Sequence, residues 1–394
     1  MNKAIIPTNK KDRLVELDVI RGIALFGILV VNINYFSTPA LYADMFHMSE
    51  SLTLPEKWLK WITIFFFEFK FVSLFSILFG VSFSLFLTRL KTRGISVNTL
   101  FKRRLYFLLI IGLIHLFFFW YGDILTIYAL LGFLLLLFVD TKPKVLLKWI
   151  ISLPLLPILM LTFGMIFRNN ILSTFTVQIA SIYEHAIYYY ANGTVVDIFK
   201  QRLIDIAYIY QGYVLMIPVI FSMFLLGMYI WKSGYITQIS TYKRELQKTR
   251  KYSGLTGMIF SFLAVWADEQ IETITSPFYF IQYMSQVISG PVFAIFYMTS
   301  LLLLLQNKIW RQRLYYLQSV GRMALTNYLM QTFICLLIFY SFGLGLFGQL
   351  NLIASFSITI LIFLVQIGYS HLWLHYHRMG PIEMIWRTFT YKQK

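Results

Sequence analysis

Long apolar runs recur along the whole chain, and they constrain its fold more than any other feature. Each holds about 20 mostly apolar residues, the length of α-helix that crosses the ~30 Å hydrocarbon layer of a membrane. We expect ten spans, at residues 17–36, 62–88, 103–120, 121–139, 145–167, 206–231, 253–268, 283–305, 319–342 and 352–375. A chain in lipid must satisfy its own backbone hydrogen bonds. The runs therefore predict an all-α fold, a polytopic integral membrane helical bundle.

The composition of the chain supports a bilayer as its solvent. Hydrophobic residues make up 58% of the 394 positions and charged residues only 13%. Soluble domains carry roughly 45–50% apolar and about 25% charged residues. No linker, repeat or low-complexity tract divides the sequence. We therefore expect a single membrane domain over residues 1–394, with halves at 1–205 and 206–391 and a polar outer segment at 168–205.

The distribution of positive charge predicts the orientation of the spans. The chain has a net charge of +17, with 34 Lys and Arg residues against 17 Asp and Glu. If the N-terminus is inside, most Lys and Arg residues fall in the segments on the cytoplasmic side, as the positive-inside rule requires. We expect both termini in the cytoplasm. Because topology accounts for the basic charge, we expect membrane lipids as partners and no nucleic acid.

Polar side chains inside the spans are costly, so they mark functional or paired positions. By depth they form two groups. The outer group contains Asn32, Asn34, Glu68, Lys70, His115 and Asp123. The inner group contains Asp18, Arg21, Arg103, Arg104, Arg322, Glu383 and Arg387. Several have structural explanations: Lys70 could pair with Glu68, and Asn32 and Asn34 could bond between helices.

His115 and Asp123 form the most specific pattern in the outer group. They are eight residues apart, on either side of the tight turn expected at Gly122. A His oriented by a carboxylate is a common general base. Two structural alternatives stay open: Asp123 could only cap the following helix, and His115 could be a packed interior side chain.

No phosphate-binding loop and no established metal motif occurs in the sequence. His371 and His375 are four residues apart, but no local Cys or acidic residue supplies a third ligand. We therefore expect no metal site.

Several motifs together resemble those of the YeiB-like family of bacterial membrane proteins, whose C-terminal half defines domain of unknown function 418. They are LDVIRGIA at 17–24 with Asn32, KFVSLFSILFG at 70–80, His115 with Trp120, GDIL at 122–125, GRMALTNY at 321–328, which contains Asn327, and GPIE at 380–383 with Arg387. The resemblance spans nearly the whole chain. It implies a multi-pass protein of the bacterial cytoplasmic membrane.

The start of the first span is also similar to heparan-α-glucosaminide N-acetyltransferase and to bacterial acyltransferases that modify surface sugars. This resemblance implies a membrane acyltransferase that takes an acyl group from cytoplasmic acyl-CoA. The acceptor would be a sugar or envelope component outside the membrane. Asn32 stands where the bacterial enzymes have a His, so we place the base at His115, with His47 in the next loop as a second candidate.

The resemblance implies roles for the remaining polar residues. Lys70, Asn32 or Asn34 would stabilise the oxyanion. Arg guanidinium groups suit phosphate, and the expected donor site is Arg21, Arg103, Arg104, Arg322, Asn327, Glu383 and Arg387.

Two other functions remain open. The chain could be a transporter or flippase, with Pro154, Pro157, Pro218 and Pro291 as hinges. It could instead be a membrane scaffold without activity. The sequence names neither the donor nor the acceptor, and a homo-oligomer stays possible.

Overall fold

The computed structural model describes residues 14–46, 52–92, 97–166, 175–271 and 276–391. Over these ranges the chain forms helices joined by turns and contains no strand, which confirms the all-α prediction. The elements are α1 Val15–Ser37, α2 Ala40–Phe46, α3 Leu54–Phe66, α4 Lys70–Thr92, α5 Val97–Ile114, η2 His115–Phe119, α6 Leu125–Leu135, η3 Leu136–Phe138, α7 Pro143–Ser152, α8 Leu155–Ile166, α9 Phe175–Asn192, α10 Val195–Lys232, α11 Lys243–Asp268, α12 Pro277–Leu304, α13 Lys308–Arg313, α14 Tyr315–Arg322, α15 Ala324–Phe339, α16 Leu352–Tyr376 and α17 Pro381–Tyr391.

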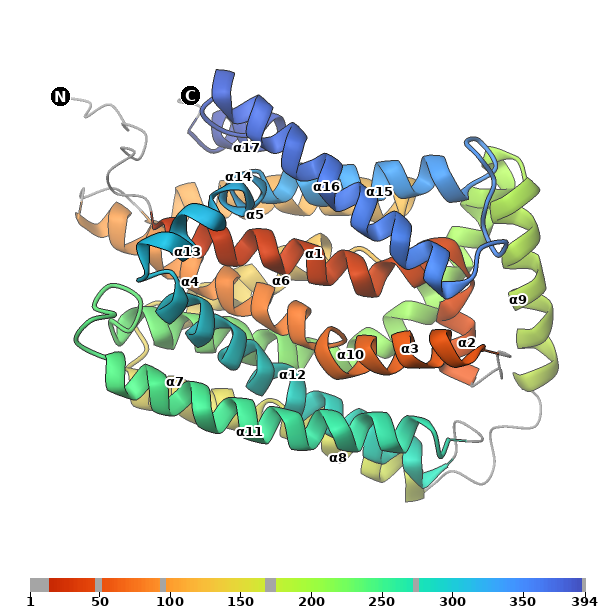
Figure 1. Cartoon of the computed structure of the whole chain (residues 1–394), viewed down its shortest axis with the longest axis horizontal. Helices are drawn as coiled ribbons and strands as arrows, with labels where there is room; N and C mark the ends of the chain where they lie inside the picture. Colours follow the sequence, from red (N-terminus) through yellow and green to blue (C-terminus); the bar gives the residue numbers. More distant parts are fainter. Residues whose placement is uncertain (1–13, 47–51, 93–96, 167–174, 272–275, 392–394) are drawn as a thin grey trace.

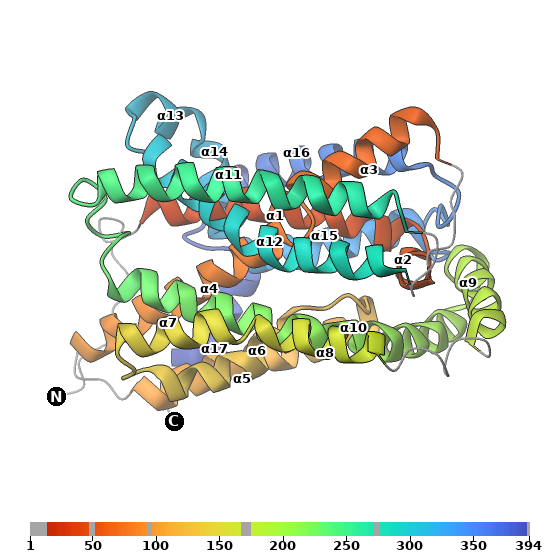
Figure 2. The ribbon, with the colours of Figure 1, turned by 90° about the horizontal axis from the view of Figure 1, so that it is seen from below.

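Most of the long helices run along one common axis (Figure 1). The start of α1, the short helix α13 and the C-terminal helix α17 lie at one end of this axis, in both views (Figures 1 and 2). Helices α2 and α9 lie at the opposite end, where α9 runs across the bundle. The described start and end of the chain therefore share one side, as the predicted topology requires. We call this side, which holds the start of α1, α13 and α17, the basic end.

Within the described residues, six helical stretches are long and apolar enough to cross a membrane: Val15–Ser37, Leu54–Lys91, Pro143–Phe163, Val195–Lys232, Pro277–Leu304 and Leu352–Tyr376. A seventh span is formed if α14 and α15, bent by 83°, count as one. The protein is therefore a multi-pass membrane protein. The other three expected spans coincide with α5, the short α6 and the charged α11, so the number of ten stays a prediction.

Several expected spans are not continuous helices; the run at 145–167, for example, is divided into α7 and α8. The run at 62–88 breaks between α3 and α4, where Phe69 takes a left-handed backbone conformation with φ of 60°. The run at 319–342 bends between α14 and α15. The expected boundary at 206 falls inside α10, which begins at Val195.

Glycines bring the helix backbones into close contact. A Cβ atom on Gly321 of α14 would overlap the Asp18 carbonyl of α1, and one on Gly22 would overlap the Leu317 carbonyl. Gly80 of α4 and Gly227 of α10 form a similar crossing. Small residues allow such close approach in membrane proteins. These crossings fix α1 against the C-terminal half and α4 against α10.

Candidate active site

His115 and Asp123 lie on opposite sides of the α5–α6 hairpin, and their side chains bond to each other. The Nδ1 atom of His115 is 2.8 Å from Oδ1 of Asp123. Both residues are buried, with exposures of 2% and 0%. The helix changes to a π-turn at His115, where the Trp120 amide donates to the His115 carbonyl at 2.8 Å. Such turns are frequent at functional sites, and this one precedes the turn that brings Asp123 alongside His115.

Asp123 also caps α6. Its second oxygen, Oδ2, accepts a hydrogen bond from the Thr126 amide at 2.7 Å. One oxygen therefore caps the helix and the other contacts the imidazole, while a catalytic role for this pair stays a prediction.

The other imidazole nitrogen has a partner that sequence reasoning missed. Nε2 of His115 is 2.9 Å from Oγ1 of Thr332, in the middle of α15. If Asp123 is ionised, it can only accept, so His115 donates through Nδ1–H and Nε2 of a neutral imidazole accepts the Thr332 proton. The three side chains form a buried Asp123–His115–Thr332 chain. With this arrangement of protons, the imidazole has the tautomer that a general base needs.

Three polar atoms near this chain lack a hydrogen-bond partner within the described part of the protein. They are Nε1 of Trp120, Oγ1 of Thr126 and the hydroxyl of Tyr328, all in buried residues. The Trp120 ring lies 6.4 Å from the His115 ring, and the Tyr328 ring lies 5.3 Å from it. An unpaired donor such as the Trp120 N–H is costly in a protein interior.

A line of buried amides runs along α15 from the basic end towards Thr332. Asn327 donates to the Val320 carbonyl at 3.1 Å and to the Ser370 hydroxyl at 2.9 Å. Gln331 donates to Oε1 of Gln366 at 2.9 Å, and Gln366 donates to the Asn327 carbonyl at 2.8 Å. We call the side chains of Asn327, Gln331 and Gln366 the amide row; the Ser370 hydroxyl is bonded to one end of it. The amide row joins α15 to α16 and provides polar side chains between the inner and outer groups of polar residues.

The arginines expected to bind phosphate are mostly held by their own chain. Arg21 contacts Asp18 and Ser82 at 2.7 Å each. The Arg104 guanidinium stacks on Trp386, 4.3 Å from the ring centroid. Arg322 donates to the Arg378 carbonyl at 2.9 Å, and Arg103 is half-buried near the start of α5. These contacts anchor helices at the basic end.

Glu383 binds the start of α15. Its Oε1 accepts from the Leu325 and Thr326 amides at 2.8 and 3.1 Å, and its Oε2 accepts from the Thr326 hydroxyl at 2.6 Å. The carboxylate therefore caps the bent α14–α15 junction. Burial raises the pKa of Glu383 above its usual value, although the bonds from Thr326 act in the opposite direction.

Arg387 lies beside a cavity of about 490 Å³ at the basic end. The cavity is lined by Tyr376, His377, Arg378, Met379, Met384, Arg387, Thr388 and Tyr391. Two of these residues are basic and none is acidic, so the lining favours an anion. We call it the tail cavity.

The remaining candidates lie in different surroundings. Lys70 is fully buried, and its Nζ donates to the Ile64 carbonyl at 2.7 Å, which satisfies the end of α3 at the helix break. The side-chain oxygen of Asn34 is 3.2 Å from the Thr38 hydroxyl. Asn32 is half-buried in α1. No contact between these three residues and His115 is recorded within the described ranges, and His47 lies outside those ranges.

Sequence reasoning also missed a second buried carboxylate. Asp205 of α10 accepts hydrogen bonds from the Tyr42 hydroxyl at 2.5 Å, from Gln201 at 2.8 Å and from the Tyr190 hydroxyl. Its neighbour Arg202 donates to the Phe117 carbonyl in the π-turn at 3.2 Å. The sequence does contain a signal, since Thr194 and Asp197 form a capping box that marks the start of α10. Through Arg202, the residues around Asp205 therefore hold the π-turn in place on the side away from the basic end.

No group of three or more His, Cys, Asp and Glu residues within the described ranges could hold a metal ion. The expectation that no metal is needed stays a prediction.

Comparison with known proteins places the chain in a family. The profile described as "Protein of unknown function (DUF418)" matches residues 230–393. The uncharacterized protein YxaH of Bacillus subtilis (strain 168) is 37% identical, over 98% of this chain and 96% of its own length. The chain belongs to the YeiB-like DUF418 family.

Two other relatives match this chain over a similar share of their length. The uncharacterized protein YeiB of Escherichia coli (strain K12) is 31% identical, over 96% of both chains. An uncharacterized 39.9 kDa protein from the amylase 3' region of Bacillus acidopullulyticus is also 31% identical, over 98% of this chain and 96% of its own length. No solved structure matches this DUF418 protein. The family prediction is confirmed, whereas the link to acyltransferases stays a prediction.

Proposed function

We propose that this DUF418 protein is a membrane-embedded acyltransferase of the bacterial cytoplasmic membrane. It would move an acyl group from acyl-CoA at the basic, cytoplasmic end to a hydroxyl or amine of an envelope component on the other side. The observation that carries the proposal is the buried Asp123–His115–Thr332 chain, with contacts of 2.8 and 2.9 Å. A buried His held by a carboxylate in its proton-accepting tautomer is suited to general-base catalysis.

The proposed reaction begins with exchange at Nε2 of His115. An acceptor hydroxyl replaces the Thr332 hydroxyl there, gives its proton to Nε2 and attacks the thioester carbonyl. The carbon–sulfur bond breaks, and the imidazolium returns the proton to the departing CoA thiolate. Asp123 stabilises the transient positive charge on His115, and the unpaired Trp120 N–H is a candidate donor to the oxyanion.

We place the CoA phosphates at the basic end, in the tail cavity. Arg378 and Arg387 line it, and none of its described lining residues is acidic. Arg322 stays in this proposed site because it holds the Arg378 backbone. Thr332 is eight residues beyond Ala324, the first residue of α15, so it lies about 12 Å along the helix. The amide row lies beside this path, where an extended thioester arm would need polar contacts.

A transfer assay in proteoliposomes tests the function. Purified protein is reconstituted, acetyl-, succinyl- or long-chain acyl-CoA with a labelled acyl group is added on the basic side, and an extract of envelope sugars is enclosed inside. We expect label to appear in the enclosed fraction with wild-type protein and not with His115→Gln. Transfer that is equal in empty liposomes, or absent with every donor, would refute acyl transfer.

Transport is the second candidate, and the helix breaks favour it. Broken helices with buried charges form substrate sites in many transporters, and Lys70 lies buried at the break between α3 and α4. Pro218 and Pro291 lie inside α10 and α12. In the same liposomes, a transporter would move labelled compounds across the membrane without covalent transfer. For a transporter, the rate of label transfer to sugars would be zero in wild type and in His115→Gln alike.

A further inference from the structure

A second cavity lies at the basic end, between the start of α11, the last turn of α12 and α13. Its volume is about 710 Å³, within the range of ligand sites. Its lining residues are Ile239, Ser240, Lys243, Gln247, Arg250, Ser300, Leu301, Leu303, Leu304, Gln306, Asn307 and Trp310. We call it the α11 cavity. None of the residues with assigned roles in acyl transfer lines it.

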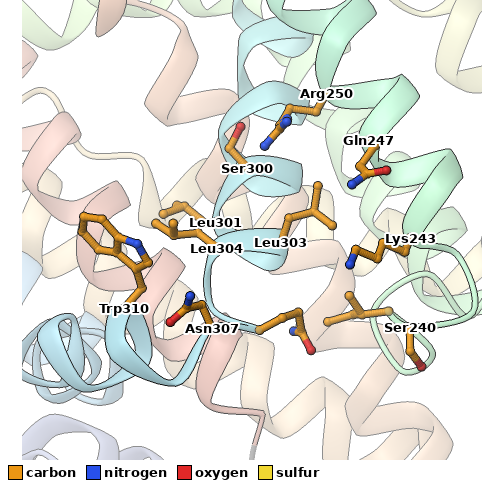
Figure 3. Close-up of a pocket in the computed structure, with 12 residues that line it drawn as sticks. Ser240, Lys243, Gln247, Arg250, Ser300, Leu301, Leu303, Leu304, Asn307 and Trp310 are labelled. Atoms are coloured by element: carbon orange, nitrogen blue, oxygen red, sulfur yellow. The ribbon is translucent and has the colours of Figure 1, made fainter.

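The polar side of the α11 cavity is positively charged. Lys243, Gln247 and Arg250 follow the spacing of one helix face, and all three point from α11 towards the end of α12 (Figure 3). None of the described residues that line the cavity is acidic. Neither Lys243 nor Arg250 forms an ion pair with any residue in the described ranges. Two full positive charges therefore face a space without a counter-charge.

The helix ends modify this charge only slightly. The first turn of α11 has no side-chain cap at Tyr242, and the end of α12 carries a partial charge of the opposite sign. Each partial charge is about half an elementary charge, less than the full charges of Lys243 and Arg250.

The other side of the cavity is apolar, because Leu301, Leu303 and Leu304 of α12 line it. Leu255, Ile259 and Phe262 of α11 have exposures of 57%, 58% and 68%. By helical spacing these three residues continue the face of Arg244, Lys248 and Lys251, about a third of a turn from the cavity face. In a membrane they contact acyl chains beside the cavity. A ligand that fits both regions has an anionic head and apolar chains, because a soluble phosphate compound would leave the apolar part uncovered.

We propose that the α11 cavity binds the phosphate head of an anionic phospholipid from the cytoplasmic leaflet. The start of α11 also carries Arg244, Lys248 and Lys251, all exposed. Basic clusters beside membrane helices attract anionic lipids, and basic pockets between helices bind their head groups. The three outer residues attract the leaflet in general, whereas Lys243 and Arg250 hold one head group. This site does not depend on acyl transfer.

The experiment compares two double variants with equal loss of charge. Lys243→Gln with Arg250→Gln changes the cavity, and Arg244→Gln with Lys248→Gln changes the same two turns outside it. Full-length protein in zwitterionic detergent is titrated with phosphatidylglycerol or phosphatidylcholine at low salt, and bound lipid is counted by native mass spectrometry. Lys243→Arg with Arg250→Lys keeps the charge and serves as a folding control.

We expect wild type and the outer variant to bind one phosphatidylglycerol tightly and phosphatidylcholine weakly. The cavity variant should bind phosphatidylglycerol about thirty-fold more weakly, since each cation near the surface contributes about 1 kcal/mol. The charge-conserving variant should bind like wild type. Equal weakening in both Gln variants would show only diffuse attraction and overturn the site. Full displacement of the lipid by coenzyme A or inorganic phosphate would overturn the lipid as its ligand.

Discussion

Replacing Asp123 with Ala tests the double role of this carboxylate. The variant loses the cap on α6, which costs about 1 kcal/mol. It also leaves the Nδ1–H of His115 without a partner in a site where both residues are buried. A buried unsatisfied donor costs about 1–3 kcal/mol. We therefore expect the free energy of unfolding to fall by about 2–4 kcal/mol.

A matched variant separates the two contributions. Asn351 caps α16 through the Ala354 amide at 2.9 Å, and it is exposed. Asn351→Ala removes a cap and nothing else, so it should cost about 1 kcal/mol. Asp123→Asn should also cost little, because its amide oxygen still caps Thr126. Its NH₂ group would instead donate to Nδ1 of His115, so the imidazole proton would move to Nε2.

Unfolding in mixed detergent micelles, followed by tryptophan fluorescence, measures these free energies. Nitrogen-15 spectra of labelled His report the tautomer in wild type and in Asp123→Asn. The reasoning is refuted if Asp123→Ala costs no more than Asn351→Ala. It is also refuted if the His115 proton stays on the same nitrogen in Asp123→Asn.

Three further predictions concern topology, packing and pH. Reporter fusions after Tyr242 and Gln312 should indicate cytoplasm and a fusion at Tyr190 the outside; a reversed sign at two of these sites would contradict the orientation. Gly321→Ala should reduce the free energy of unfolding by about 1–3 kcal/mol, because its methyl group would overlap the α1 backbone; an unchanged stability would contradict the close crossing. Because burial raises the pKa of Glu383, the folded protein holds this proton more tightly than the unfolded chain, so its contribution to stability falls as pH rises from about 4.5 through the raised pKa. Melting temperatures across this range should therefore fall less in Glu383→Gln than in wild type, and equal slopes would contradict the pKa direction.

The His115–Asp123 contact could be predicted because it is local. The two residues belong to one hairpin, and the turn between them is short enough to fix their relative depth. The position of Asp123 also predicts a helix cap, because a carboxylate before an apolar helix usually caps it. The sequence supports both roles without any knowledge of the remaining fold.

The Thr332 contact could not be predicted, because it depends on tertiary packing. Thr332 is 217 positions from His115, and nothing in its local sequence distinguishes it from other Thr residues in the spans. The break between α3 and α4, just before Lys70, could not be predicted for a similar reason. Phe69 carries no turn signal, yet it takes a positive φ, a conformation that is rare for a bulky residue.

Charge alone does not predict the partners of the residues in the expected donor site. The sequence groups Arg21 and Arg104 as phosphate ligands because both are basic and lie at similar depth. In the structure they contact Asp18 and Trp386, partners whose proximity depends on helix packing. Arg202 and Asp205 were assigned to a polar outer segment because charged residues weaken an apolar run. A capping-box analysis at Thr194 would have placed them inside α10.

The most direct test of acyl transfer is the rate of label transfer in proteoliposomes for wild type, His115→Gln and Asp123→Asn. All three proteins should elute as folded species, because Gln fills most of the His115 site and Asn keeps the α6 cap. We predict transfer by wild type, none by His115→Gln, and a strongly reduced but measurable rate for Asp123→Asn, whose imidazole survives in the wrong tautomer. Transfer by His115→Gln at the wild-type rate would contradict the account.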